Sequence, residues 1–249
     1  MKNNRPFCLS IAGYDPTAGA GVLADSKTFE MFKVYGMAII TSNTLQTDTD
    51  FLDVEWLNIE RVKTQIEILF SKYDFKSMKI GLVENFDALQ QIILLAKKLN
   101  PTIHIVWDPI LKSSSGFDFH SDKMLDLKFL EDNCTLITPN WEEFVSLWVK
   151  DYNILLQQQP KTSILIKGGH RQEKNGCDLL YSNGNFVEIE GVSFNGKSKH
   201  GTGCVLSAAI TACLSKGIDL MDSCAQAKRY VEQFILSNET NLGHHYDNK

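Results

Sequence analysis

Short apolar runs recur along the chain, and longer stretches whose apolar positions follow a helical spacing separate them. The runs are apolar at consecutive positions, which is typical of strands that are covered on both faces, as in a parallel sheet. They lie at residues 7–12, 37–41, 78–81, 104–107, 135–138 and 163–167.

The stretches between the runs are amphipathic, with apolar residues three or four positions apart and polar residues elsewhere. This spacing places the apolar side chains on one face of a helix. The predicted helices include residues 59–73, 86–99, 203–216 and 220–236. We therefore expect an α/β fold with three αβα layers, in which helices cover both faces of a mostly parallel central sheet.

One segment near the middle of the second half departs from this alternation. Residues 177–181 and 186–190 flank Asn183-Gly184, and Asn-Gly between two strand-like runs is a strong signal for a tight hairpin. No repeat or low-complexity linker divides the sequence, so we expect residues 1–249 to form a single domain. The polar tail 238–249 is expected to be frayed, with exposed histidines.

Composition excludes several classes of function. Of the 249 residues, 43% are hydrophobic and 22% charged, which is enough to build a core. The formal net charge of -5 disfavours a nucleic-acid binder, and no apolar run is long enough to span a bilayer. The six cysteines are scattered, and no signal peptide is evident. We expect a cytoplasmic protein with neither nucleic acid nor membrane as a partner.

The segment Gly201-Thr202-Gly203-Cys204 leads directly into the predicted helix 203–216. Small residues at a helix start leave several backbone N–H groups unpaired, and the helix dipole adds positive charge there. This arrangement predicts an anion pocket, in which the same field would lower the pKa of the Cys204 thiol. An ordinary glycine turn with a buried cysteine explains the same residues.

A second glycine-rich loop, residues 13–21, follows the first apolar run and precedes Asp25. Its spacing is not that of a P-loop and fits a dinucleotide fingerprint poorly. Loops at the carboxyl ends of parallel strands are nevertheless the usual ligand sites of such sheets. Asp25 could accept a hydrogen bond from a ligand, or it could be a solvated acid near a helix start.

Charged residues stand at or just past the ends of three apolar runs: Asp108, Glu143 and Lys167. A carboxylate pair with a lysine at one sheet edge could hold Mg²⁺ and polyphosphate. Each residue alone could equally be a helix cap or a surface charge, but their repeated position favours a site.

Several short motifs follow one another along nearly the whole chain. They are Ser10-Ile11-Ala12-Gly13-Tyr14-Asp15-Pro16, Gly19-Ala20-Gly21, Lys79-Ile80-Gly81, Asp108-Pro109, Thr138-Pro139-Asn140, Ile166-Lys167-Gly168-Gly169-His170 and His200-Gly201-Thr202-Gly203-Cys204. Together they resemble the ribokinase-like superfamily and, within it, the hydroxymethylpyrimidine/phosphomethylpyrimidine kinases. Cys204 stands where the sugar kinases of that superfamily have aspartate.

The resemblance implies an ATP-dependent kinase of thiamine biosynthesis, with ATP and Mg²⁺ as cofactors. It would phosphorylate 4-amino-5-hydroxymethyl-2-methylpyrimidine and then convert the monophosphate to the diphosphate. A small-molecule pyrimidine would be its substrate partner, and a homodimer its assembly.

On the phosphate side of the site, the resemblance assigns a role to each of several residues. Cys204 would handle the proton of the substrate hydroxyl, and the amides of Gly201, Thr202 and Gly203 would form an anion hole. Lys167 would lie near the nucleotide phosphates. Asp108 would assist metal and phosphate, and Glu143 would reach Mg²⁺ through water.

On the substrate side, Gly13 and Ala20 would line the pyrimidine pocket, while Asp25 and Gln46 would hydrogen-bond the ring. The sequence departs from the family's common pattern here: Ala18 replaces a frequent glycine, and Leu82 a frequent methionine.

Two other functions fit the same fold. A pyridoxal-type kinase would also act on a hydroxymethyl group attached to an aromatic ring. A non-catalytic pyrimidine- or nucleotide-binding protein is the alternative from another class, but it would not need Cys204, Glu143 and Lys167 together.

Overall fold

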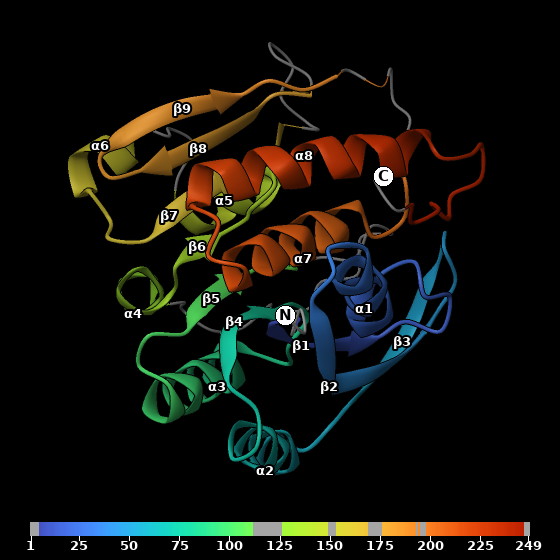
Figure 1. Cartoon of the computed structure of the whole chain (residues 1–249), viewed down its shortest axis with the longest axis vertical. Coiled ribbons are helices and arrows are strands. Elements are labelled where there is room, and N and C mark those ends of the chain that lie inside the picture. Colours follow the sequence, from blue (N-terminus) through green and yellow to red (C-terminus); the bar gives the residue numbers. More distant parts are fainter. Residues whose placement is uncertain are drawn as a thin grey trace.

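A nine-stranded sheet forms the centre of the computed structural model, in the order β3-β2-β1-β4-β5-β6-β7-β8-β9 (Figure 1). The structure describes residues 5–111, 126–148, 153–168, 176–192, 194 and 198–246. Its strands are β1 Phe7–Tyr14, β2 Tyr35–Gln46, β3 Phe51–Trp56, β4 Phe75–Ile80, β5 His104–Trp107, β6 Leu136–Ile137, β7 Ser163–Ile166, β8 Asp178–Ser182 and β9 Asn185–Ile189.

Helices cover both faces of this sheet, as the sequence predicts (Figure 1). One core cluster joins the sheet to α2–α6, and two further clusters join the opposite face to α1, α7 and α8. The helices are α1 Gly21–Met31, α2 Ile59–Phe70, α3 Phe86–Leu99, α4 Leu127–Asn133, α5 Trp141–Trp148, α6 Ile154–Gln158, α7 Thr202–Ser215 and α8 Leu220–Leu236. The three-layer prediction is confirmed.

The central strands run parallel, so their carboxyl ends share one edge of the sheet. From β1 the chain builds outward to β2 and β3, and then returns to pair β4 on the other side of β1. Such a reversal of strand order opens a crevice at the carboxyl edge, where open α/β sheets bind ligands. The candidate site therefore lies beyond the ends of β1, β4 and β5.

The hairpin β8–β9 confirms the prediction of a tight turn at Asn-Gly. Asn183 and Gly184 both have positive φ angles, 50° and 78°, as a type I′ turn requires. The arm formed by β2 and β3 was not predicted, because β3 alternates polar and exposed apolar residues, among them Leu52. Only residues 37–41 of β2 form an apolar run, whereas the strand extends to Gln46.

The polar tail is ordered by contacts, so the prediction of a frayed end is wrong for residues 238–246. The Lys199 ammonium donates to the backbone carbonyls of Asn238 and Thr240. The imidazole of His245 lies against Tyr230, and its Nδ1 is 2.9 Å from the Tyr230 hydroxyl oxygen. Burial lowers the pKa of His245 to about 4. Among the helices that the structure describes, none has the length and apolar composition needed to cross a membrane.

Candidate active site

Asp108 is the centre of a buried polar cluster just beyond β5. Lys167, which directly follows β7, donates to Asp108 Oδ1 at 2.9 Å. Thr138 donates to the same oxygen at 3.1 Å, and Ser207 of α7 donates to Oδ2 at 3.0 Å. Burial raises the pKa of the Asp108 carboxyl, but the charges of Lys167 and Lys79 and the hydrogen bonds from Lys167 and Ser207 outweigh burial and hold the pKa below its ordinary value.

Glu143 lies on the other side of the same lysine. Its Oε2 is 3.7 Å from Lys167 Nζ and accepts a 2.7 Å hydrogen bond from the Asn140 N–H. The Asn140 side chain accepts from the Glu143 N–H in return, which forms a reciprocal cap at the start of α5. Burial raises the pKa of Glu143 to about 7, although the charge of Lys167 opposes the shift. Lys167 thus lies between the two carboxylates, Asp108 and Glu143.

The first turn of α7 faces this cluster. Gly201 is its N-cap and has φ 75°, and no side chain in the described part of the chain caps the helix. By contrast, Asn58, Asn85 and Asp219 cap α2, α3 and α8 with side-chain hydrogen bonds. A Cβ added to Gly203 would lie 3.3 Å from Lys167 Nζ. The predicted anion pocket therefore lies at a helix start without a side-chain cap and beside a lysine, the chemistry that binds phosphate. The Thr202 N–H, however, already donates to the Lys199 carbonyl at 3.3 Å.

Cys204 lies in this first turn but does not have the predicted acidic thiol. Burial raises the pKa of the thiol to about 11, and the carboxylates of Asp25 and Asp108 add to the shift. The Lys79 ammonium and the Gly21 N–H act in the opposite direction. The helix field that the sequence suggests is smaller than the cost of burying a thiolate, so Cys204 is a neutral thiol in the free protein.

Asp25 is fully buried and does not face an open pocket. Its Oδ1 is 2.5 Å from Lys79 Nζ, and its Oδ2 accepts a 2.5 Å hydrogen bond from Ser10. Both carboxylate oxygens therefore have protein partners. Hydrogen bonding of this carboxylate to a substrate ring stays a prediction, because an ionised carboxylate oxygen can accept more than one hydrogen bond.

The remaining substrate-side residues lie around the first glycine loop. Ala20 is the N-cap of α1 and contributes no side-chain hydrogen bond. A Cβ on Gly13 would lie 3.1 Å from Leu82 and 3.7 Å from the methyl group of Thr44. Gln46 lies farther along β2, where its amide donates to the Thr44 hydroxyl at 2.9 Å. Gly13, Ala20 and Gln46 thus lie on the β1–β2 side of the edge.

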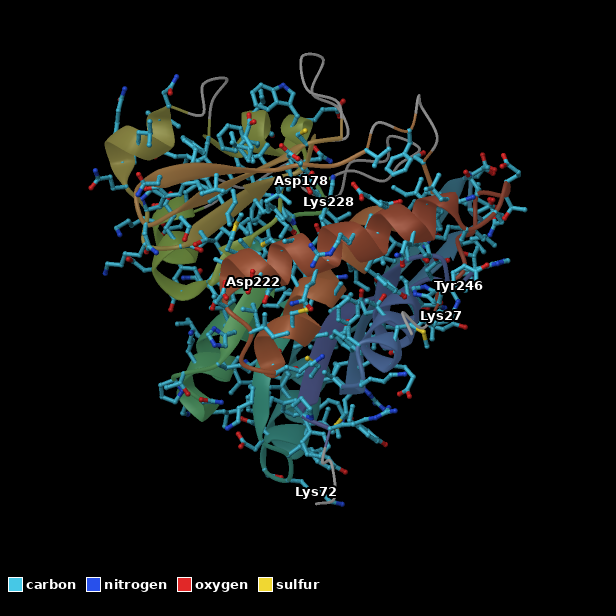
Figure 2. All side chains as sticks on the ribbon, turned by 45° about the horizontal axis from the view of Figure 1, so that its top comes forward. Lys27, Lys72, Asp178, Asp222, Lys228 and Tyr246 are labelled. Atoms are coloured by element: carbon cyan, nitrogen blue, oxygen red, sulfur yellow. The ribbon has the colours of Figure 1, made fainter. Side chains whose placement is uncertain are left out.

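A further ion pair supports the loop after β7. Asp178 Oδ1 accepts from the Gly168 N–H at 2.7 Å and from Lys228 of α8 at 3.2 Å. Figure 2 shows Asp178 and Lys228 side by side over α8. This pair fixes the backbone directly after Lys167. The motif residues Gly169 and His170 lie outside the described residues.

Sequence reasoning assigned no role to four residues that the structure brings into the site: Lys79, Ser207, His200 and Asp15. A signal existed for Lys79, because a lysine interrupts an otherwise apolar run that predicts a buried strand. The histidine and the aspartate were part of quoted motifs, but no spacing rule relates positions so far apart in the chain.

The acidic side chains fit a magnesium ion only in part. In the described part of the chain, no three His, Cys, Asp or Glu side chains gather to hold a metal. Both Asp108 oxygens accept hydrogen bonds from the protein, and the Lys167 ammonium lies between Asp108 and Glu143. This donor set suits Mg²⁺ that arrives with a polyphosphate and keeps several waters, rather than an ion caged by the protein.

Comparison with known proteins gives a consistent result. The family model for phosphomethylpyrimidine kinase matches residues 15–248. The hydroxymethylpyrimidine/phosphomethylpyrimidine kinase of Aquifex aeolicus (strain VF5) is 34% identical over 254 residues, covering 97% of this chain and 98% of that protein. The kinase of the same name from Rhizobium meliloti (strain 1021) is 32% identical over 241 residues, covering 92% and 90%.

Solved structures give the same fold. The phosphomethylpyrimidine kinase of Clostridium difficile 630 has a TM-score of 0.76 and 32% identity, covering 92% of this chain and 99% of that one. The pyridoxal kinase of Staphylococcus aureus, in complex with ADP, has a TM-score of 0.80 at 24% identity, covering 96% and 92%. At that identity the second likeness is evidence for the fold alone.

Proposed function

Because the chain belongs to the phosphomethylpyrimidine kinase family, we propose that it transfers a phosphoryl group from ATP to a hydroxymethylpyrimidine. The acceptor is 4-amino-5-hydroxymethyl-2-methylpyrimidine, and its monophosphate is the acceptor of the second transfer. The names of the relatives support both steps, and the family places the reaction in thiamine biosynthesis.

The observation that carries the proposal is the uncapped start of α7 beside Lys167. Catalysis of phosphoryl transfer depends mainly on alignment and on stabilising charge on the transferring group. Backbone N–H groups of Gly201 and Gly203, with the partly buried Lys167 ammonium, would supply that stabilisation. The Thr202 N–H would join them by leaving the Lys199 carbonyl, to which it donates at 3.3 Å. A protein that only binds pyrimidines has no use for such a pocket.

The transfer step follows from these groups. The acceptor oxygen forms a bond to the γ-phosphorus while the bond from that phosphorus to the β–γ bridging oxygen breaks, and ADP leaves. The amides of Gly201, Thr202 and Gly203 hold the equatorial oxygens, and Lys167 interacts with the nucleotide phosphates. Cys204 handles the hydroxyl proton: its thiol first gives its own proton to solvent, and the thiolate then takes up the hydroxyl proton and ends as the neutral thiol.

Cofactor roles on this chain follow from the same cluster. We expect Mg²⁺ to enter with ATP, where it would neutralise phosphate charge. Glu143 would reach it through water, and Asp108 would orient Lys167 and contact the ion's water shell. No step depends on a cage of protein ligands.

On the substrate side, Gly13 and Ala20 would line the pyrimidine pocket, and Gln46 would hydrogen-bond the ring. Asp25 would hydrogen-bond the ring as well, and it also neutralises Lys79 beneath the first turn of α7. A homodimer is the assembly that the family resemblance implies, and sedimentation equilibrium would measure it.

The proposal is tested by supplying the protein with ATP, Mg²⁺ and the hydroxymethylpyrimidine, and by separating the products. We expect the monophosphate first and then the diphosphate. If the folded protein phosphorylates neither the hydroxymethylpyrimidine nor its monophosphate, the proposed function is wrong. Formation of the monophosphate alone would limit the function to the first transfer.

A further inference from the structure

The loop at residues 13–21 and the loop before α7 touch along their backbones. Gly201 has φ 75°, and a Cβ added there would lie 1.9 Å from the carbonyl oxygen of Gly19 and 2.8 Å from the Ala20 Cα. No side chain fits between the two loops at this point. The substrate-side loop and the phosphate-side loop are therefore packed together as one unit.

Two buried side chains join the same loops. His200 Nε2 lies 2.8 Å from Asp15 Oδ2, and the two side chains are only 7% and 2% exposed. The imidazole also fills the space above Gly19, where a Cβ would lie 2.6 Å from His200 Cδ2. The contact thus combines a hydrogen bond with close packing.

Asp15 at the same time folds its own loop. Its oxygens accept from the Thr17 N–H and hydroxyl at 2.9 Å and from the Ala20 N–H at 2.8 Å. Burial raises the pKa of Asp15, but hydrogen bonds, of which that from His200 contributes most, outweigh burial and hold it below its ordinary value. One carboxylate therefore sets both the shape of the loop and its link to His200.

The C-terminal segment fixes His200 from the other side. The His200 N–H donates to the Asn241 carbonyl at 2.9 Å, while Lys199 donates to Asn238. The end of the chain returns to the side of α1, where Figure 2 shows Tyr246 and Lys27 on the same side of the molecule. His200 is thus held at its backbone, and its ring is directed at Asp15.

The register between the two loops determines what surrounds the Cys204 sulfur. The N–H of Gly21, the first residue of α1, acts to lower the pKa of that thiol. Gly21 follows directly after Ala20, which Asp15 holds, and Cys204 follows four residues after His200. Any slip between the loops would move the Gly21 N–H away from Cys204 and would change the distance from the pyrimidine side to the anion pocket.

We propose that His200 and Asp15 form a positioning couple that sets the register between the two loops and so holds Cys204 in place for phosphoryl transfer. The couple acts as a pair of positioning residues, through the placement of Cys204 and of the Gly21 N–H. Its kinetic consequence rests on the proposed function, whereas its consequence for Cys204 can be measured without any substrate.

The kinetic test uses His200→Ala with His200→Gln as the rescue. Misplacement of reacting groups by a fraction of an ångström lowers turnover strongly, so we expect His200→Ala to reduce kcat about 10-fold or more. The KM for ATP should stay within about 2-fold of the wild-type value, because the couple is not expected to bind ATP in the ground state. The glutamine amide can donate to Asp15 and should restore most of kcat. His104→Ala, a histidine replacement on β5 far from these loops, is the matched control.

The substrate-free test follows alkylation of Cys204 by iodoacetamide, with the modified peptide quantified by mass spectrometry. Cys204 is 6% exposed, so alkylation of the wild-type thiol should be slow and should report local opening. We expect His200→Ala to react about 10-fold faster, and His200→Gln to react at close to the wild-type rate, since buried thiols react only through such openings. If His200→Ala does not fold, Asp15→Asn, which keeps the shape of the side chain, takes its place with the same expectation.

Two results would overturn the couple: wild-type alkylation and kcat in His200→Ala, or a folded His200→Gln that is as impaired as the alanine variant. If the wild-type protein phosphorylates no pyrimidine, the proposed function fails. The alkylation rates still decide whether the couple positions Cys204.

Discussion

Two opposite charges, Lys79 and Asp25, meet in the interior between β4 and α1. Both side chains are 0% exposed, and the ammonium also lies 3.4 Å from the carbonyl oxygen of Cys204. A buried ion pair of this kind contributes little net stability, but removing one partner leaves the other charge without compensation. The pair therefore makes the start of α7 dependent on a residue in the sheet below it.

Replacing Lys79 with methionine tests this dependence. We expect the free energy of unfolding to fall by about 3–5 kcal/mol, because the Asp25 carboxylate is left buried and unpaired. Adding Asp25→Asn to Lys79→Met should recover most of the loss, since the remaining amide can still accept from Ser10. Urea denaturation measures both values. A double variant as unstable as the single one would show that the charge of Asp25 is not the cause.

The position of Cys204 could be predicted from the sequence, but its ionisation could not. Its place at the start of a helix follows from small residues preceding an apolar periodic segment. Its pKa depends on burial and on Asp25 and Asp108, which lie far away in the chain. The ion-pair partner of Asp25 could not be predicted for the same reason, because only the fold brings Lys79 beside it.

At the scale of elements, α1 and α7 differ from several of the other helices in how they begin. No described side chain caps α1 or α7, whereas α2, α3, α4 and α8 each have an Asn or Asp cap. An uncapped start keeps N–H groups available for a ligand or for the Cys204 sulfur. The missing caps do not by themselves mark the site, because α6 also has no side-chain cap hydrogen bond and α5, which carries Glu143, is capped by Asn140.

The variant Gly201→Ala should separate the close contact between the two loops from ordinary backbone strain. Gly201 and Gly217 both have φ 75°, but a Cβ at Gly217 meets nothing within 4 Å. Gly217→Ala should cost about 1–2 kcal/mol through left-handed strain, with activity unchanged. Gly201→Ala has the same strain and also pushes the two loops apart, so we expect kcat to fall about 100-fold. Equal kcat values in the two variants would contradict the close packing of the loops.

Long amphipathic helices were the elements best predicted from sequence. The boundaries of α3 and α8 match the expected ranges, because an apolar stripe and a capping side chain mark them. The arm of β2 and β3 was missed, since its strands are partly exposed and their pairing depends on tertiary structure. The three-layer architecture could be predicted because strand-like and helical segments alternate along the sequence. The order of the strands in the sheet could be read only from the structure.

At the scale of the molecule, the chain has the three-layer αβα architecture of ribokinase-like proteins, with the site at the carboxyl edge of the sheet. The C-terminal segment 238–246 forms hydrogen bonds that connect two sides of this edge. It accepts from Lys199 and His200, and Asn241 donates to the Asp48 carbonyl at 3.1 Å. It therefore links the phosphate side to the β2–β3 arm.

Deleting residues 238–249 tests how much these hydrogen bonds stabilise the protein. The deletion leaves the Lys199 ammonium, which is 8% exposed, without its carbonyl acceptors. We expect a loss of about 2–4 kcal/mol in unfolding free energy, the cost of an unpaired buried charge that can partly reach water. A deletion of residues 247–249 alone keeps every described contact and is the control. Equal melting temperatures for both deletions would show that the segment does not contribute.

The central claim is that this chain phosphorylates a hydroxymethylpyrimidine at the start of α7. The most direct measurement is the ratio of kcat/KM for 4-amino-5-hydroxymethyl-2-methylpyrimidine to that for pyridoxine, at saturating ATP and Mg²⁺. A site built to pair the polar edge of the aminopyrimidine should favour it by about 10-fold or more. A preference for pyridoxine would contradict the claim and make the chain a pyridoxal-type kinase on the same fold.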